Sequence, residues 1–129
     1  MKNIIFSAGH NPDKQGASWN GVTENQVALK WVQRMMNTIL EVISETGGAN
    51  LYGIGTGGLT QKVRAVNMIV DADDGIPAKD NLAIELHFNA AGSAYVEGCE
   101  TLYAPGSVAG ARYAKLIHEA FMARSGDAV

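Results

Sequence analysis

Short, unbroken apolar segments alternate in this chain with longer segments whose apolar residues recur at every third or fourth position. The first apolar segment, Ile4–Phe6, is soon followed by Gly9 and Pro12. A run without polar alternation is typical of a strand buried on both faces, as strands of parallel sheets are. The alternation with helical periodicity therefore favours an α/β fold, in which a mostly parallel, twisted sheet is flanked by helices.

Seven elements are expected, in the order strand, helix, strand, helix, strand, strand, helix. The first helix should begin at Glu24, because Thr23 and Gln26 can form a capping box. It should stop at Gly47–Gly48. The other expected elements are strands at 51–54, 82–88 and 96–103, a helix at 59–72, and a last helix capped by Ser107 that ends near Gly126. The residues expected to face inward are Ala28, Val32, Met35, Ile39 and Ile43 in the first helix and Val63, Val66 and Val70 in the second.

The size and charge of the chain argue against some classes of function. Its 129 residues suffice for one domain with a buried core. Ten basic residues against thirteen acidic ones give a net charge of −3, without the basic surface that nucleic-acid binding requires. Cys99 is the only cysteine, so no intrachain disulfide can form, and we expect it to be a small apolar core residue.

The segment 1–10 carries one lysine and a short apolar run before it reaches His10. A secretory signal has a longer apolar region and a small-residue cleavage site, and no part of the chain approaches the length of a transmembrane helix. We therefore expect synthesis in the cytoplasm without a signal peptide, and no insertion into a membrane.

Three possible zinc ligands stand at the ends of the expected elements. His10 follows the first strand, Glu24 opens the first helix, and His87 lies near the end of the strand at 82–88. In open α/β sheets, ligands collect beyond the carboxyl ends of the strands. Two imidazoles and a carboxylate fix three tetrahedral positions of a catalytic zinc and leave the fourth for water. Each residue alone has an ordinary structural interpretation, but together they point to metal-assisted hydrolysis.

Short motifs in a fixed order carry a resemblance to a known family. They are Gly9-His10 after the first strand, His87-Phe88-Asn89 after a later one, and Gly98-Cys99-Glu100-Thr101-Leu102-Tyr103 beyond it. With Glu24 and the segment Arg64–Asn67, the chain resembles the zinc-dependent N-acetylmuramoyl-L-alanine amidases of the amidase-3 type over nearly its whole length. The resemblance implies hydrolysis of the amide bond between N-acetylmuramic acid and L-alanine in peptidoglycan, with Zn²⁺ as cofactor and the stem peptide and glycan as partners.

The resemblance also implies a mechanism and a biological setting. In the family, zinc lowers the pKa of its water and polarises the amide carbonyl. Because no signal peptide is expected, we expect a phage or prophage endolysin, which acts on the bacterial cell wall after release through a membrane lesion, rather than an exported host amidase.

Three further residues are expected to support the site. Asn89 and Glu100 match family positions near the metal, although Asn after a strand is also common turn chemistry. Glu85 alternates with His87 along one strand, so both side chains should point to the same side of the sheet. Glu85 is therefore either a neighbour of the metal ligand or an ordinary paired polar residue.

The general acid/base that the resemblance implies is not found among these residues. The family carries it as a glutamate on a late strand, whereas this chain ends at Gly126–Val129. We expect residues 1–129 to be a single amidase-like catalytic domain, truncated at its C-terminus before the last strand and helix, which binds zinc but catalyses poorly. The alternative is a naturally incomplete, noncatalytic domain that binds peptidoglycan stem peptides.

One motif competes with this interpretation. The segment Gly53–Gly58 matches G-x-G-x-x-G, with Asp73 and Asp74 further along the chain, as in dinucleotide-binding proteins. In that fold the acidic residue ends the next strand, whereas here both aspartates precede the strand at 82–88. A dinucleotide-binding domain is therefore the more remote alternative, since it also leaves the three candidate ligands unexplained.

Overall fold

A computed structural model describes the chain except for residues 1, 56, 73–76, 78–79, 89–97 and 126–129. The chain divides into two parts, residues 1–90 and 91–129, and each is described by itself. The elements of the first part are β1 (Asn3–Ala8), β2 (Ser18–Trp19), β3 (Val22–Thr23), α1 (Glu24–Thr46), β4 (Asn50–Ile54), α2 (Leu59–Ala72) and β5 (Asn81–Leu86). The second part contains α3 (Val108–Ser125).

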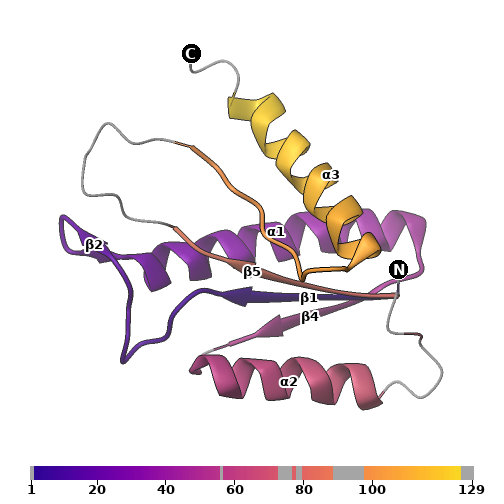
Figure 1. Ribbon diagram of the computed structural model, residues 1–129, viewed down its shortest axis with the longest axis horizontal. Coiled ribbons are helices and arrows are strands. Elements are labelled where there is room, and N and C mark those ends of the chain that lie inside the picture. The colour runs from indigo at the N-terminus through magenta and orange to yellow at the C-terminus, as the bar shows by residue number, and fades with distance from the viewer. Residues whose placement is uncertain (1, 56, 73–76, 78–79, 89–97, 126–129) are drawn as a thin grey trace. The chain divides into compact units, whose positions relative to one another are not determined.

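Among the described residues, the main sheet consists of β4, β1 and β5, in that order, and both pairings are parallel. Phe6 in β1 stands opposite Gly53 in β4 and opposite Ile84 in β5. Successive residues of a strand face opposite sides of the sheet, and α1 lies over one side while α2 lies over the other (Figure 1). The expected α/β class with a parallel sheet flanked by helices is confirmed.

The core of the first part lies between β1 and α1. Phe6 and Ala8 pack against Ala28 and Val32, and all four are buried. Gly53 allows this close packing, since a Cβ there would lie 2.8 Å from the sulfur of Met36. The partly buried residues around this cluster are Ile4, Leu29, Met35, Met36, Ile39, Leu51, Ile84 and Leu86. The inward face expected for the first helix is therefore confirmed at Ala28, Val32, Met35 and Ile39.

Both ends of α1 are as expected. The hydroxyl of Thr23 accepts from the N–H of Gln26 at 3.4 Å, and the side-chain oxygen of Gln26 accepts from the N–H of Thr23 at 3.0 Å. At the other end, Gly47 has a φ of 69° and donates its N–H to the carbonyl of Ile43. The capping box fixes the first turn of the helix, which begins with Glu24.

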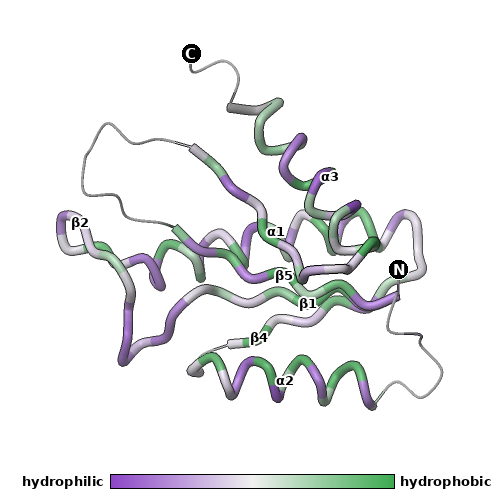
Figure 2. Tube along the Cα trace, in the orientation of Figure 1, coloured by the Kyte–Doolittle hydropathy of each residue, from purple (hydrophilic) through white to green (hydrophobic). Residues whose placement is uncertain are grey.

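The inward face expected for the second helix is found in part: Val66 and Val70 are half-buried, but the expectation for Val63 was wrong. Val63 is 48% exposed, whereas Lys62 is only 5% exposed. Lys62 precedes Val66 by one helical turn, so the two side chains share one face of α2. Figure 2 shows α2 alternating between hydrophobic and hydrophilic residues along its length. A lysine on the buried face needs polar partners, which β1 and β5 supply.

Three asparagines pair across the amino ends of the parallel strands. Asn3 donates its side-chain amide to Asn81 at 2.7 Å, and Asn50 donates to Asn3 at 2.9 Å. The strand register places both partners directly opposite Asn3, which is fully buried. A slip of one residue would move each side chain to the other face, so this row favours a single register.

One expected strand was wrong, and a short hairpin precedes α1 that the sequence analysis does not predict. The strand expected at 96–103 is not found in its described residues, Gly98–Tyr103. A strand needs a neighbouring strand to bond its backbone groups, and these residues form no such pairing. Gly98 also has a φ of 149°. The loop before the first helix, in contrast, contains the hairpin β2–β3, whose turn residues Asn20 and Gly21 have φ values of 49° and 78°. Such a turn is typical of two-residue hairpins.

In the second part, Ser107 caps α3 as expected, and its hydroxyl accepts from the N–H of Gly110 at 3.0 Å. The hydroxyl of Thr101 lies 3.4 Å from Nδ1 of His118. Cys99, which we expected in the core, is exposed. Among the described residues, no helix combines the length and the apolar composition needed to cross a membrane.

Candidate metal centre

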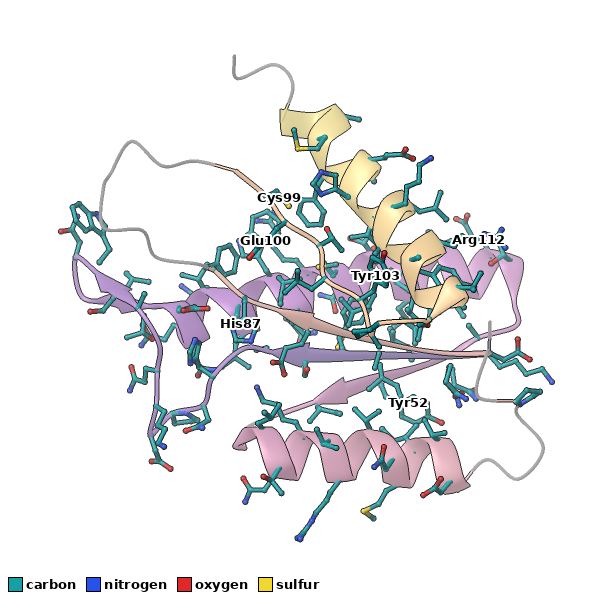
Figure 3. All side chains as sticks on the ribbon, viewed as in Figure 1. Tyr52, His87, Cys99, Glu100, Tyr103 and Arg112 are labelled. Atoms are coloured by element: carbon teal, nitrogen blue, oxygen red, sulfur yellow. The ribbon has the colours of Figure 1, made fainter. Side chains whose placement is uncertain are left out.

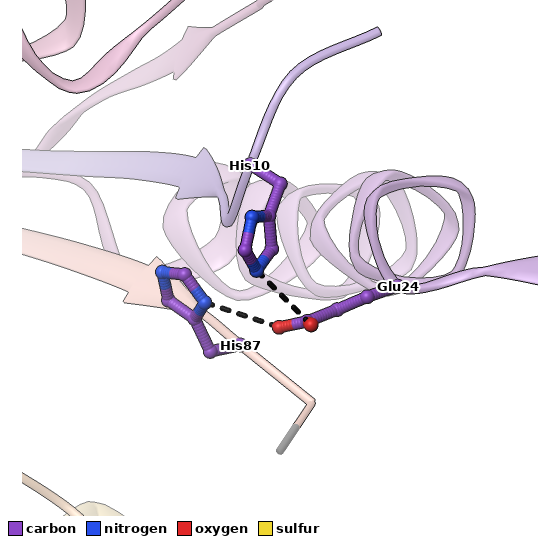
Figure 4. Close-up of side chains that lie close together, drawn as sticks. All are labelled: His10, Glu24 and His87. Carbon is purple, nitrogen blue, oxygen red and sulfur yellow. Dashed lines mark hydrogen bonds and ion pairs between the residues drawn. The ribbon is translucent and has the colours of Figure 1, made fainter. Parts of the chain in front are cut away.

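The carboxyl ends of β1 and β5 lie side by side, and a histidine follows each of them. His10 comes shortly after β1, and His87 comes directly after β5. Glu24 is the first residue of α1, which packs on the same strands. Figure 4 shows the three side chains converging on one point. The fold therefore brings the three candidate ligands together from distant parts of the sequence.

Glu24 contacts both histidines through different oxygens. Its Oε2 lies 3.0 Å from Nε2 of His10, and its Oε1 lies 3.1 Å from Nδ1 of His87. The centroids of the two imidazole rings are 5.0 Å apart, and the ring planes are inclined at 73°. One ring nitrogen from each histidine and one carboxylate oxygen all lie within 4.8 Å of one another. This is a compact set of two nitrogen donors and one oxygen donor.

Backbone groups hold the Glu24 carboxylate in place. The N–H of Phe88 donates to Oε1 at 2.8 Å, and the N–H of Ala17 donates to Oε2 at 3.3 Å. Burial raises the pKa of the Glu24 carboxyl, but these two N–H groups, the hydrogen bond with His87 and the charge of His10 together hold that pKa below its ordinary value of 4.5. Glu24 is therefore ionised at neutral pH, as a metal ligand must be.

The donor set fits a zinc ion. In a tetrahedral site with bonds of about 2.0–2.1 Å, neighbouring donor atoms lie about 3.3 Å apart. One ring nitrogen from each histidine and one Glu24 oxygen lie within 4.8 Å of one another, so small side-chain movements would bring them to that spacing. The side chains of His10 and His87 are 33% and 44% exposed, whereas that of Glu24 is 6% exposed. Glu24 thus forms the buried side of the cluster, and the two histidines form the side that solvent can reach.

Two glycines let the backbone approach this cluster closely. A Cβ at Gly9 would lie 2.6 Å from Nδ1 of His87, and a Cβ at Gly16 would lie 2.5 Å from the ring of His10 and 2.6 Å from Oε2 of Glu24. Gly16 also has a φ of 75°. His10 itself has a φ of 61°, which is uncommon for a residue other than glycine and often marks a functional position.

Of the expected supporting residues, Glu85 lies next to a candidate ligand. Its Oε1 is 2.8 Å from Nε2 of His87, and its Oε2 accepts from the hydroxyl of Ser7 at 3.0 Å and from Nζ of Lys62 at 3.3 Å. Burial raises the pKa of the Glu85 carboxyl, but hydrogen bonds from His87 and Ser7 and the charge of Lys62 lower it below its ordinary value. Glu85 is therefore a neighbour of His87, which follows β5 instead of lying within the strand as expected.

The other two supporting residues remain predictions. Asn89 lies outside the described residues. Glu100 is exposed in the segment before α3, in the second part of the chain (Figure 3).

Sequence reasoning missed two buried polar side chains beside the site, Lys62 and Asn25. Asn25 donates its side-chain amide to the carbonyl of Gly9 at 2.8 Å. The signal for Lys62 was its helical spacing from Val66 and Val70, which puts a charge on the face that should be apolar. The signal for Asn25 was weaker, since a polar residue in the first turn of a helix is common.

A family model described as N-acetylmuramoyl-L-alanine amidase matches residues 4–128. The chain belongs to this amidase-3 family. Members of the family are hydrolases of N-acetylmuramoyl-L-alanine bonds in peptidoglycan, and they are generally dependent on zinc. Comparison of the amidase with curated proteins and with solved structures gave no significant match.

The glycine-rich segment of the amidase has a local structural role. The N–H of Gly58 is bonded to the side-chain oxygen of Gln61 at 2.8 Å, and the carbonyl of Gly58 accepts from the N–H groups of Gln61 and Lys62. The segment therefore starts α2, and the amide of Gly58 that a phosphate would need is already bonded. Thr56, Asp73 and Asp74 lie outside the described residues.

Proposed function

We propose that this amidase holds one zinc ion through His10, Glu24 and His87 and cleaves the amide bond between the lactyl group of N-acetylmuramic acid and L-alanine. The observation that supports this most is the convergence of three donors within 4.8 Å at the carboxyl ends of neighbouring parallel strands. When bound, zinc supplies a Lewis acid for the amide carbonyl and lowers the pKa of water. The fourth position is left for solvent or substrate.

The protein's own residues prepare this site. The N–H groups of Phe88 and Ala17 keep the Glu24 carboxylate oriented and charged. The backbone at Gly16 lies close against the side chains of His10 and Glu24 and thereby limits their movement. The partly exposed histidines leave one side of the cluster open, where the glycan and stem peptide of peptidoglycan can approach.

The finer biological setting is part of the same proposal. An endolysin of phage or prophage origin acts on the cell wall after release from the cytoplasm, and the family's substrate is consistent with that setting. Digestion of purified cell walls, with release of free amino groups from L-alanine, is the expected activity in this setting.

The first test is zinc content together with hydrolysis of a purified muropeptide. The amidase should bind one zinc per chain, and His10→Ala and His87→Ala should bind much less. His118→Ala is the matched control, because His118 lies on α3 and is bonded to Thr101 instead. Undiminished zinc in the first two variants would refute the assignment of ligands. Zinc and muropeptide binding without any cleavage would support the metal site and contradict the hydrolytic part of the proposal.

A further inference from the structure

His87 uses its two ring nitrogens for different partners. Nδ1 faces the Glu24 carboxylate at 3.1 Å, whereas Nε2 faces the Glu85 carboxylate at 2.8 Å. A histidine that binds a metal commonly donates its second N–H to a carboxylate, which fixes the tautomer and the ring orientation. With Glu85 accepting at Nε2, the lone pair of Nδ1 is directed toward the cluster. Glu85 therefore contacts the ring nitrogen of His87 that faces away from the proposed metal position.

Glu85 is in turn held by a buried lysine. Lys62, on α2, has a side chain that is 6% exposed and lies 3.3 Å from Oε2 of Glu85. The two residues border a groove of about 310 Å³ between α2 and the sheet, and its walls include Ile5, Val66 and Ala83. Apolar surroundings strengthen such a contact and raise the cost of breaking it. The position of the Glu85 carboxylate thus depends on Lys62.

Lys62 has a second partner on the other histidine-bearing strand. Its Nζ also donates a hydrogen bond to the carbonyl of Ala8, close to His10 in the chain. The next carbonyl, that of Gly9, accepts from Asn25 of α1 at 2.8 Å. Side chains from both helices therefore hold the backbone just before His10. Of Lys62 and Asn25, it is Lys62 that also contacts Glu85, the partner of His87.

We propose that Lys62 is a positioning residue for the metal centre, which acts on His87 through Glu85 and on the segment before His10 through the Ala8 carbonyl. One buried ammonium group thereby contacts both Glu85, next to His87, and the backbone before His10. These two contacts set the distance between the imidazoles of His10 and His87. The inference rests on the proposed metal binding by His10, Glu24 and His87. It goes beyond that proposal because it predicts that a residue outside the ligand set controls zinc affinity.

The test uses the full chain with Lys62→Met, Glu85→Gln and the double variant. Lys62→Met keeps an unbranched side chain but removes the charge, and Glu85→Gln keeps the shape of the carboxylate. The control variants are Lys115→Met and Glu119→Gln, because this pair, 3.7 Å apart on α3, is exposed. Two quantities are measured: the zinc dissociation constant, by competition with a chromophoric chelator, and the NMR signal of the His87 Nε2–H in the zinc-loaded protein.

We expect each single substitution to weaken zinc binding by about 10- to 100-fold. The Nε2–H signal should shift or broaden, because the proton loses its fixed acceptor. The double variant removes both members of the ion pair and leaves neither without its partner, so it should unfold at a higher temperature than the single variants and yet keep the weakened zinc affinity. A purely structural role predicts that zinc affinity recovers together with stability. The control variants should bind zinc as the unaltered protein does.

Three outcomes would overturn the proposal. If folded Lys62→Met and Glu85→Gln bind zinc with unchanged affinity, Lys62 has no positioning role. If Lys62→Met does not fold, the zinc affinities of Glu85→Gln and of the double variant test the proposal instead. Unchanged zinc affinity in both variants would again overturn the positioning role of Lys62. If the unaltered protein binds no zinc, the proposed function itself fails, and that result is visible before any variant is compared.

Discussion

Glu24 is the residue on which the candidate metal centre depends most, because each of its carboxylate oxygens contacts a different histidine. Glu24→Gln keeps the shape of the side chain and removes its charge, so zinc affinity should fall. The amide nitrogen would face one of the two backbone N–H donors, which should cost about 1–3 kcal/mol of stability. Zinc titration and thermal unfolding of this variant measure the two effects.

The same variant separates the metal site from the glycine-loop alternative. A dinucleotide-binding domain predicts that Glu24→Gln is silent and that Gly55→Ala abolishes nucleotide binding. Unchanged zinc affinity in the first variant, together with NAD binding that depends on Gly55, would contradict the amidase interpretation.

Gly16 offers a test of the close backbone approach. Gly16→Ala should weaken zinc binding, since its Cβ would lie 2.5 Å from the His10 ring and 2.6 Å from the Glu24 carboxylate. Gly21→Ala is the matched control, because Gly21 has nearly the same φ, 78° against 75°, and its Cβ would meet no atom within 4 Å. Both variants carry the same backbone strain, so equal zinc affinities would show that the contact is unimportant.

The lowered pKa of Glu85 predicts how stability changes with pH. A carboxyl whose pKa is lower in the folded than in the unfolded state stabilises the fold above the unfolded value, and this contribution is lost as the pH falls through the folded value. In the metal-free protein, the free energy of unfolding should therefore fall as the pH decreases below 4.5, the ordinary value. Glu85→Gln should lose less over the same range. Denaturant unfolding at several pH values in this range measures the free energy of unfolding of both proteins. An equal loss of stability in the unaltered protein and in Glu85→Gln would contradict the prediction.

At the scale of the element, the start of α1 couples helix stability to the site. The capping box at Thr23 directly precedes Glu24, so a frayed first turn would displace the carboxylate. Thr23→Ala should cost about 1 kcal/mol of stability and should also weaken zinc binding. Ser107→Ala removes the comparable cap of α3 and should lower stability alone. If both variants change zinc affinity equally, the effect is not specific to this helix start.

The elements also show where sequence patterns stop being informative. Both ends of α1 were predicted because their signals are local, namely Thr23 with Gln26 and then Gly47. The segment Gly98–Tyr103 has an apolar pattern but no strand assignment, since a strand also needs a partner, which local sequence does not specify. The hairpin at Asn20–Gly21 was missed although Asn-Gly is a strong two-residue turn signal.

At the scale of the whole molecule, the residues of the candidate site were easier to predict than their supports. His10 and His87 follow strands of a parallel sheet, and the carboxyl ends of such strands meet at one edge, so their proximity could be inferred. The burial of Lys62 could not, because it depends on the contact of α2 with β1 and β5. The family match over residues 4–128 agrees with the order of the motifs.

The most direct test of the metal centre is an anomalous difference map, recorded at the zinc absorption edge, from crystals grown with one equivalent of zinc. A single peak bound by Nε2 of His10, Nδ1 of His87 and a carboxylate oxygen of Glu24 is the predicted result, since these are the atoms that face one another. A peak on other residues, or a cluster that stays without zinc while the ion binds elsewhere, would contradict it.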